Sequence, residues 1–162
     1  MHRYKHILIA ADLISSDDDP ISERAEEIAA ASGAVISLVH VIEPFYHYIS
    51  PYVMEKTMQW QEQTVASCSE KLAILGQKLG VPEKRQFTVV GVTNQAILSV
   101  AKEIEADLIM VGSHGRHGLG LLFFGSTAKD IMAEASCDVL AVNIGERKSE
   151  LEPVSNLAFS SE

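Results

Sequence analysis

The chain has 162 residues and a mass of 17.7 kDa, which fits one ordinary domain. Its net charge of −9 disfavours general nucleic-acid binding and anionic membrane surfaces, because both depend on clustered Lys and Arg. No apolar run approaches the roughly 18 residues of a membrane-spanning helix. Cys68 and Cys137 are far apart and indicate neither a disulfide framework nor a metal-binding motif. We therefore expect a cytoplasmic protein with reduced thiols and no nucleic-acid or membrane partner.

Short apolar runs alternate with segments of helical spacing along the chain. The continuous apolar runs are typical of strands buried on both faces, and apolar residues three and four apart predict amphipathic helices. In chain order, the predicted elements are strand 5–11, helix 20–32, strand 34–41, helix 58–79, strand 86–90, helix 97–104, strand 107–111, helix 128–135 and strand 139–142. The acidic run Asp17–Asp19 is expected to cap the first helix, and Phe45–Tyr52 is expected to be an aromatic linker.

The alternation of five strands with four helices predicts βαβ units and a parallel sheet. Right-handed crossovers then give an α/β fold, an open five-stranded parallel sheet with helices on both faces. No repeat or long linker divides the chain, so we expect one domain over residues 1–145 and a polar tail over 146–162. Ligands of such sheets bind beyond the carboxyl ends of the strands, where the strand order switches direction.

A glycine-rich loop follows the fourth predicted strand and ends where Ser126 and Thr127 open the next helix. Its glycines let backbone N–H groups approach a ligand, and a helix N-terminus offers unpaired N–H groups with partial positive charge. This combination favours a phosphate. Leu121-Leu122 replaces the Lys and Ser/Thr of a P-loop, and Phe123 interrupts a dinucleotide fingerprint, so neither motif is present. The loop could equally be a permissive turn, and Ser126 could cap its helix without any ligand.

The pattern Gly112-x-x-Gly115, nine residues, then Gly125-Ser126 resembles the nucleotide-binding signature of the universal stress protein family. The likeness runs from about Tyr4 to Ile144 and includes the opening KHILIAADL. It implies a Rossmann-like, nucleotide-binding α-hydrolase-type sandwich. It also implies ATP or another adenine nucleotide with Mg²⁺, and a homodimer with the last strand, Val139 to Val142, in the interface.

The resemblance also implies a role for each part of the site. Ala11 and Val41 would flank the adenine, and Asp12 would reach the ribose or a phosphate-bound Mg²⁺. The loop glycines would let the backbone wrap the phosphates, the two hydroxyls would donate hydrogen bonds to them, and the arginine would screen their charge. The implied phosphate-binding residues are Gly112, Gly115, Arg116, Gly125, Ser126 and Thr127. Leu121 stands where the family commonly has a basic residue.

These features predict an ATP-binding, dimeric stress-response module whose output is a conformational or partner-binding change. Two alternatives stay open: a slow ATPase or autokinase with a loop-end hydroxyl as acceptor, and an interaction dimer without nucleotide. No metal site built from protein ligands alone is expected, because His114 and His117 lack a third ligand. His40 lies in an apolar strand and is expected to be a hydrogen-bonded core or interface residue.

Overall fold

The structure, a computed structural model, describes residues 3–13, 19–44, 51–113 and 125–144, with the backbone alone at Pro51 and Tyr52. In chain order its elements are β1 (His6–Ala10), α1 (Pro20–Ser32), β2 (Val35–Ile42), α2 (Pro51–Lys78), the 3-10 turn η1 (Glu83–Arg85), β3 (Gln86–Val90), α3 (Thr93–Glu103), β4 (Leu108–Ser113), α4 (Ser126–Glu134) and β5 (Asp138–Asn143). Every predicted strand and helix is present. The largest difference is that α2 begins at Pro51 instead of Met58, inside the predicted linker. The tail at 146–162 lies outside the described residues.

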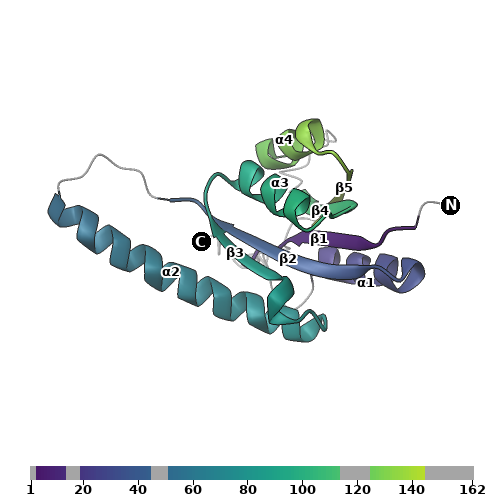
Figure 1. Ribbon diagram of the computed structural model, residues 1–162, viewed down its shortest axis with the longest axis horizontal. Coiled ribbons are helices and arrows are strands. Elements are labelled where there is room, and N and C mark those ends of the chain that lie inside the picture. Colours follow the sequence, from purple (N-terminus) through teal and green to yellow (C-terminus); the bar gives the residue numbers. More distant parts are fainter. Residues whose placement is uncertain (1–2, 14–18, 45–50, 114–124, 145–162) are drawn as a thin grey trace, which may run out of the picture.

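The strands form one parallel sheet in the order β3-β2-β1-β4-β5, which confirms the predicted fold class (Figure 1). From β1 the chain moves outward through β2 to β3 and then returns to β4 on the other side of β1. The strand order therefore switches direction between β1 and β4. In open α/β sheets this is the point where the strand ends leave a crevice for a ligand.

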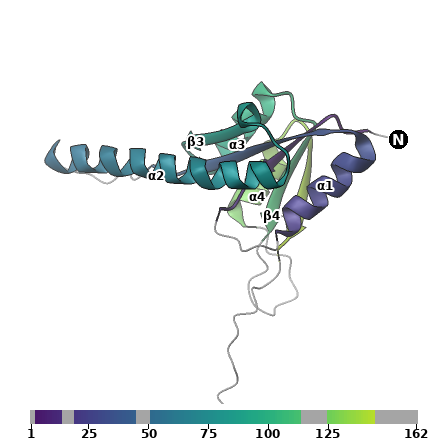
Figure 2. The ribbon, with the colours of Figure 1, turned by 90° about the horizontal axis from the view of Figure 1, so that it is seen from below.

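Helices cover both faces of the sheet because side chains along each strand alternate between the faces. Ile7 and Ile9 pack with α1 and α2 on one face, whereas Leu8 packs with α3 and α4 on the other. These three side chains are at most 1% exposed. Figure 2 shows α1 and α2 on the side of the sheet away from α3 and α4. The continuous apolar runs in the sequence reflect strands that are buried on both faces.

Helix α1 is bounded by residues suited to its two ends. Asp19 is the N-cap, and its carboxylate accepts a hydrogen bond from the Ile21 N–H at 3.1 Å, as the acidic run predicted. Pro20 follows at the first helical position, where a missing N–H costs nothing. Gly33 ends the helix with φ of 76°, and its N–H donates to the Ala29 carbonyl at 2.7 Å. A left-handed residue at this position favours glycine.

The amino-terminal half of α2 extends beyond the edge of the sheet (Figures 1 and 2). Met54, Met58 and Trp60 are each 59% exposed there. Farther along the same helix, Leu72 is 1% exposed and belongs to the core beneath the sheet. The apolar stripe predicted from Met58 is therefore buried only where the sheet lies against it. Among the described helices, α2 included, none combines the length and apolar character needed to cross a membrane.

A polar cluster holds the start of β1 at the amino edge of the sheet. The His6 Nε2 atom lies 2.7 Å from the hydroxyl of the fully buried Ser37, and the Asp107 carboxylate accepts the His6 N–H at 3.0 Å. Burial lowers the pKa of the His6 imidazole below its usual value, and the Arg85 charge lowers it further. A backbone hydrogen bond to Ile104 and the Asp107 carboxylate offset only part of this shift.

This lowered pKa predicts a loss of stability in mild acid. The unfolded chain takes up a proton at His6 that the folded chain resists, so stability should fall as the pH drops below about 6.5. Urea unfolding between about pH 7.5 and pH 5.5 measures the drop, with the His6→Gln variant as the control that cannot titrate there. The drop should be smaller in the variant. Equal drops in the two proteins would assign the loss to other groups.

Candidate functional site

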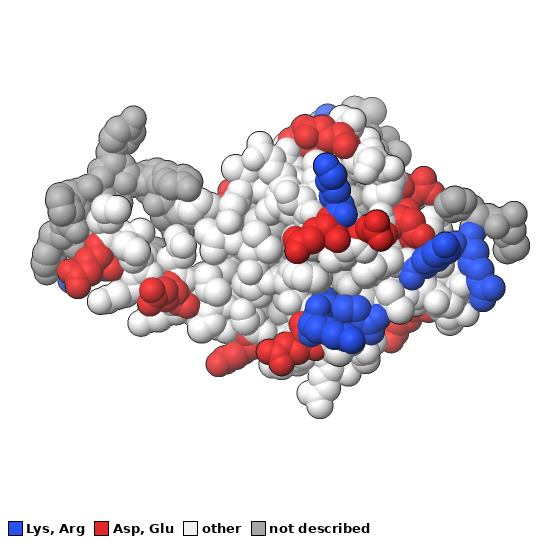
Figure 3. All heavy atoms as spheres, in the orientation of Figure 1, with Lys and Arg blue, Asp and Glu red and all other residues white. Residues whose placement is uncertain are grey.

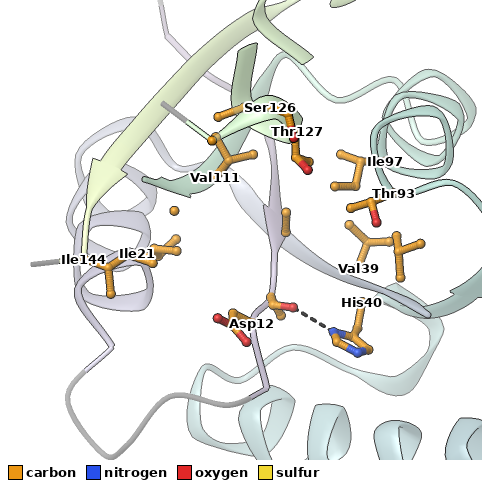
Figure 4. A pocket seen from close by; sticks show the side chains of 16 residues that line it. Asp12, Ile21, Val39, His40, Thr93, Ile97, Val111, Ser126, Thr127 and Ile144 are labelled. Carbon is orange, nitrogen blue, oxygen red and sulfur yellow. Dashed lines mark hydrogen bonds between the residues drawn. The ribbon is translucent and has the colours of Figure 1, made fainter. Parts of the chain in front are cut away.

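A cavity of about 370 Å³ opens at the carboxyl edge of the sheet, where the strand order switches between β1 and β4 (Figure 4). Its walls come from the ends of β1, β2 and β4, from the first turns of α3 and α4, and from residues of α1 and the end of β5. The connections that follow β1 and β4 lead to opposite faces of the sheet at this point, so segments distant in the sequence line the same cavity.

The cavity brings together most of the residues that the sequence predicted. Gly115 and Arg116 lie outside the described residues, as does Leu121. The predicted residues that line the cavity are Ala11, Asp12, Val41, Gly112, Gly125, Ser126 and Thr127. They come from four separate segments of the chain, and Asp12 faces Ser126 and Thr127 from the opposite side of the space (Figure 4).

The amino terminus of α4 forms one wall of the cavity. Gly125 is the N-cap and has no side chain to accept from the first N–H groups. Ser126 is the first residue within the helix, so the prediction that Ser126 caps it is wrong. The Gly125 carbonyl accepts the Lys129 N–H at 3.2 Å and starts the helical ladder. No side chain of the described residues caps the first N–H groups of the helix, and these groups, with the hydroxyls of Ser126 and Thr127, suit an anion.

Gly112 and Gly125, the two loop glycines among the described residues, have different surroundings. A Cβ at Gly112 would overlap the Ile144 Cδ1 and would lie 3.2 Å from the Ile21 Cδ1. Gly112 is therefore closely packed, because an added methyl group would make the ends of the Ile144 and Ile21 side chains move at the cavity wall. A Cβ at Gly125 would meet no atom of the described residues within 4 Å. Its N-cap geometry, with φ of −56°, suits any residue.

The side of the cavity opposite α4 is formed by the end of β1 and the neighbouring part of β2. The half-buried Asp12 directly follows Ala11, whose N–H donates to the Val39 carbonyl at 2.8 Å. The His40 Nδ1 atom lies 2.9 Å from the Ala11 carbonyl oxygen, and His40 lines the cavity. His40 was predicted to be a hydrogen-bonded core or interface residue; the hydrogen bond is present, and its place in the cavity lining was not predicted. The sequence feature that could have assigned His40 to the site is its polar side chain, which stands next to Val41 near the carboxyl end of an apolar strand.

The rim beside α3 carries a further polar contact that sequence reasoning missed. Thr93, the first residue of α3, lines the cavity and donates a hydrogen bond to the Glu43 carboxylate at 2.7 Å. Asp12 is the acidic residue of the cavity lining. No group of three or more His, Cys, Asp or Glu side chains in the described parts of the chain is arranged to hold a metal ion.

The contrast between the two glycines predicts that the same substitution has a larger effect on stability at Gly112 than at Gly125. Gly112→Ala should destabilise the fold by about 1 kcal/mol or more, because the added methyl overfills a packed contact. Gly125→Ala should change the free energy of unfolding by less than about 0.5 kcal/mol, because the methyl enters open space. Denaturant unfolding of the two variants and the parent chain measures both. Equal stabilities for the two variants would contradict the packing role of Gly112.

Comparisons with known proteins place this chain in a family. The chain matches the Universal stress protein family over residues 3–143. Universal stress protein A homolog 1 of Coxiella burnetii is 42% identical, over 88% of this chain and 97% of its own length. Universal stress protein A homolog 2 of the same organism is 35% identical, over 89% and 98%.

Solved structures share the fold at lower identity. Universal stress protein UspA from Lactobacillus plantarum superposes with a TM-score of 0.69 at 22% identity, covering 88% of this chain and 99% of its own. A universal stress protein solved in complex with cAMP gives a TM-score of 0.58 at 22% identity, covering 88% and 98%. The resemblance found in the glycine spacing is thus confirmed across nearly the whole chain, and the protein belongs to the universal stress protein family.

Proposed function

We propose that the cavity binds an adenine nucleotide, ATP with Mg²⁺, and that binding drives a signalling change in a dimeric stress-response protein. The observation that carries the proposal is the amino terminus of α4, which brings Ser126 and Thr127 to the cavity opposite Asp12 (Figure 4). Helix N–H groups and hydroxyls suit phosphate oxygens. A carboxylate across the cavity suits ribose hydroxyls or a phosphate-bound Mg²⁺.

The base would lie against the apolar part of the cavity. Val39, Val41 and Ile97 line it and belong to the core on the face covered by α3 and α4. A small-molecule site of this kind combines an apolar lining with a few placed polar groups, and about 370 Å³ lies within the usual range. The family member solved with cAMP supports an adenine-containing ligand.

The single carboxylate of Asp12 fits Mg²⁺ that arrives with the nucleotide. Protein Mg²⁺ sites commonly use one or two carboxylates and take other ligands from phosphates and water. Gly115 and Arg116 keep their proposed roles in wrapping and screening the phosphates. Leu121 contributes no charge to that screening, so the backbone N–H groups and the α4 hydroxyls carry most of the phosphate binding in this proposal.

The dimer would form along β5, over the stretch Val139 to Val142. β5 is an edge strand of the described sheet, and a groove between it and α1 runs beside Leu140 and Ala141. The Ile144 N–H donates to the Ser113 carbonyl on β4. Because successive strand residues point their N–H groups to opposite sides, the N–H of Ala141 points away from β4. No strand of the described sheet lies on that side of β5, so in this proposal the Ala141 N–H pairs with the edge of a second copy.

The cytoplasm is the proposed compartment. Cys68 and Cys137 are both free thiols, as expected in a reducing environment. Burial and the nearby Asp138 and Asp107 carboxylates raise the pKa of the Cys137 thiol, which makes it a poor nucleophile at neutral pH. Figure 3 shows acidic side chains interspersed with basic ones on this face of the molecule. The whole chain carries a net charge of −9.

Calorimetric titration of ATP with Mg²⁺ into nucleotide-stripped protein tests the ligand. We expect one ATP per chain, recovered intact, with micromolar affinity. Ser126→Ala should weaken binding about 10-fold to 100-fold, the effect of losing one hydrogen bond to a charged group. Ser69→Ala on α2, where the hydroxyl bonds Thr88, is the matched control and should bind normally. Absence of both heat and a shift in melting temperature would overturn nucleotide binding. Sustained release of ADP would favour the slow ATPase.

Sedimentation velocity tests the dimer. The parent chain should sediment as twice 17.7 kDa. Ala141→Pro should shift it toward monomer, because proline removes an outward N–H while the bonds to β4 remain. Far-ultraviolet circular dichroism checks that the variant is folded. A folded Ala141→Pro variant that stays dimeric would place the interface on another surface.

A further inference from the structure

A hydrogen bond at the rim of the cavity joins the end of β2 to the start of α3. The Thr93 hydroxyl donates to the Glu43 carboxylate at 2.7 Å. Thr93 is the first residue of α3 and lines the cavity, whereas the exposed Glu43 directly follows β2 and stands outside the lining. A carboxylate is favoured near the amino terminus of a helix, so this position suits Glu43. The contact therefore holds the Thr93 hydroxyl in one orientation.

This bond uses the only hydrogen of the hydroxyl. A hydroxyl group has one hydrogen to donate and two lone pairs that accept, whereas a carboxylate only accepts. With its hydrogen directed at Glu43, the Thr93 oxygen presents only lone pairs to any other group. The direction of this one hydrogen bond thus makes Thr93 an acceptor toward a ligand in the cavity.

Thr93 stands on the apolar side of the cavity, where the base would lie. Figure 4 shows it beside Ile97 and Val39, which the proposed function assigns to the base. His40 is a second polar side chain of the lining, and its Nδ1 atom lies 2.9 Å from the Ala11 carbonyl oxygen. A carbonyl oxygen only accepts, so Nδ1 carries the hydrogen, and the neutral ring keeps a lone pair at Nε2. Both side chains therefore direct a hydrogen at the protein and keep lone pairs for other groups.

We propose that Thr93, with its hydrogen directed at Glu43, is a specificity-determining residue that selects a base with an amino group at the edge facing α3. This inference rests on the proposed nucleotide binding by the cavity and adds the choice of base. The exocyclic amino group of adenine donates hydrogen bonds, whereas the carbonyl oxygen at the same ring position of hypoxanthine only accepts. An amino group pairs with the Thr93 oxygen, but a carbonyl brings two acceptors together and leaves both unpaired.

Inosine triphosphate is the matched probe, because its base is hypoxanthine and its ribose and triphosphate are those of ATP. Titration calorimetry with Mg²⁺ gives the affinity for each nucleotide. The parent chain should bind ATP at least about 10-fold more tightly, because a site that pairs with one polar group rejects the analogue lacking it. Thr93→Val keeps the shape of the side chain without its hydroxyl. It should weaken ATP binding about fivefold, change inosine triphosphate binding less than about twofold, and so remove most of the preference.

Glu43→Ala tests the direction of the hydrogen. Without the carboxylate, the Thr93 hydroxyl can turn and donate to the carbonyl oxygen of inosine triphosphate. The ratio of the two affinities should therefore fall about fivefold, with inosine triphosphate gaining relative to ATP. Loss of a negative charge acts alike on two nucleotides with the same triphosphate, so it leaves this ratio unchanged. A merely structural role of Glu43 would weaken both nucleotides in the same proportion.

Glu83→Ala is the matched control for the loss of an exposed acidic side chain. Glu83 lies in η1, directly before β3, and so at the opposite edge of the parallel sheet from the cavity. Its ratio of affinities should equal that of the parent chain. Thermal melting of each variant reports whether the fold is intact.

The outcomes distinguish this inference from the proposed function. If the parent chain binds ATP and inosine triphosphate equally well, the selection by Thr93 is overturned and nucleotide binding stands. An unchanged ratio in folded Thr93→Val or in folded Glu43→Ala also overturns it. If the parent chain binds neither nucleotide, the proposed function fails first, and the selection of the base fails with it.

Discussion

The parallel pairing of β1 with β4 is the constraint on which the rest of the structure depends. Its register sets Ile7 beside Leu108 and Ile9 beside Met110, so the two strands end close together at the same edge. The connections that follow them lead to opposite faces, α1 to one and α4 to the other. Both faces of the sheet are thereby covered, while the space beyond the two strand ends stays open to a ligand.

That opening places two demands on the segments around it. The wall must be packed tightly enough to be stable, and it must leave room for a ligand. Gly112 meets the first demand, because Ile21 and Ile144 approach each other across it. Gly125 is the candidate for the second, since the space beside its Cα is empty of described atoms. Two glycines of one sequence motif thus have different surroundings, one packed and one open. Their spacing in the sequence alone does not predict this difference.

The sequence predicted the elements and the sheet edge at which the cavity opens, because both follow from local rules. Buried strands read as apolar runs, and Asp19 next to Pro20 marks a helix start. The features that the sequence did not predict depend on tertiary contacts. Periodicity extended the buried stripe of α2 to Met58, although no sheet lies beneath it there. The cap of α4 is Gly125 because the chain turns one residue earlier than the hydroxyl pattern suggested. His40 needed the register of β2 against β1 before its partner was visible.

The polar groups across the cavity are held by different means. Ser126 and Thr127 sit in the first turn of α4, where the helix backbone itself sets their positions. Asp12 sits just past the end of β1, on the side of the cavity opposite α4. β2 contacts the preceding residue, Ala11, through the Val39 carbonyl and the imidazole of His40. The same strand also contributes Val39 and Val41 to the apolar wall, so one element of the sheet aligns the apolar and the acidic parts of the cavity.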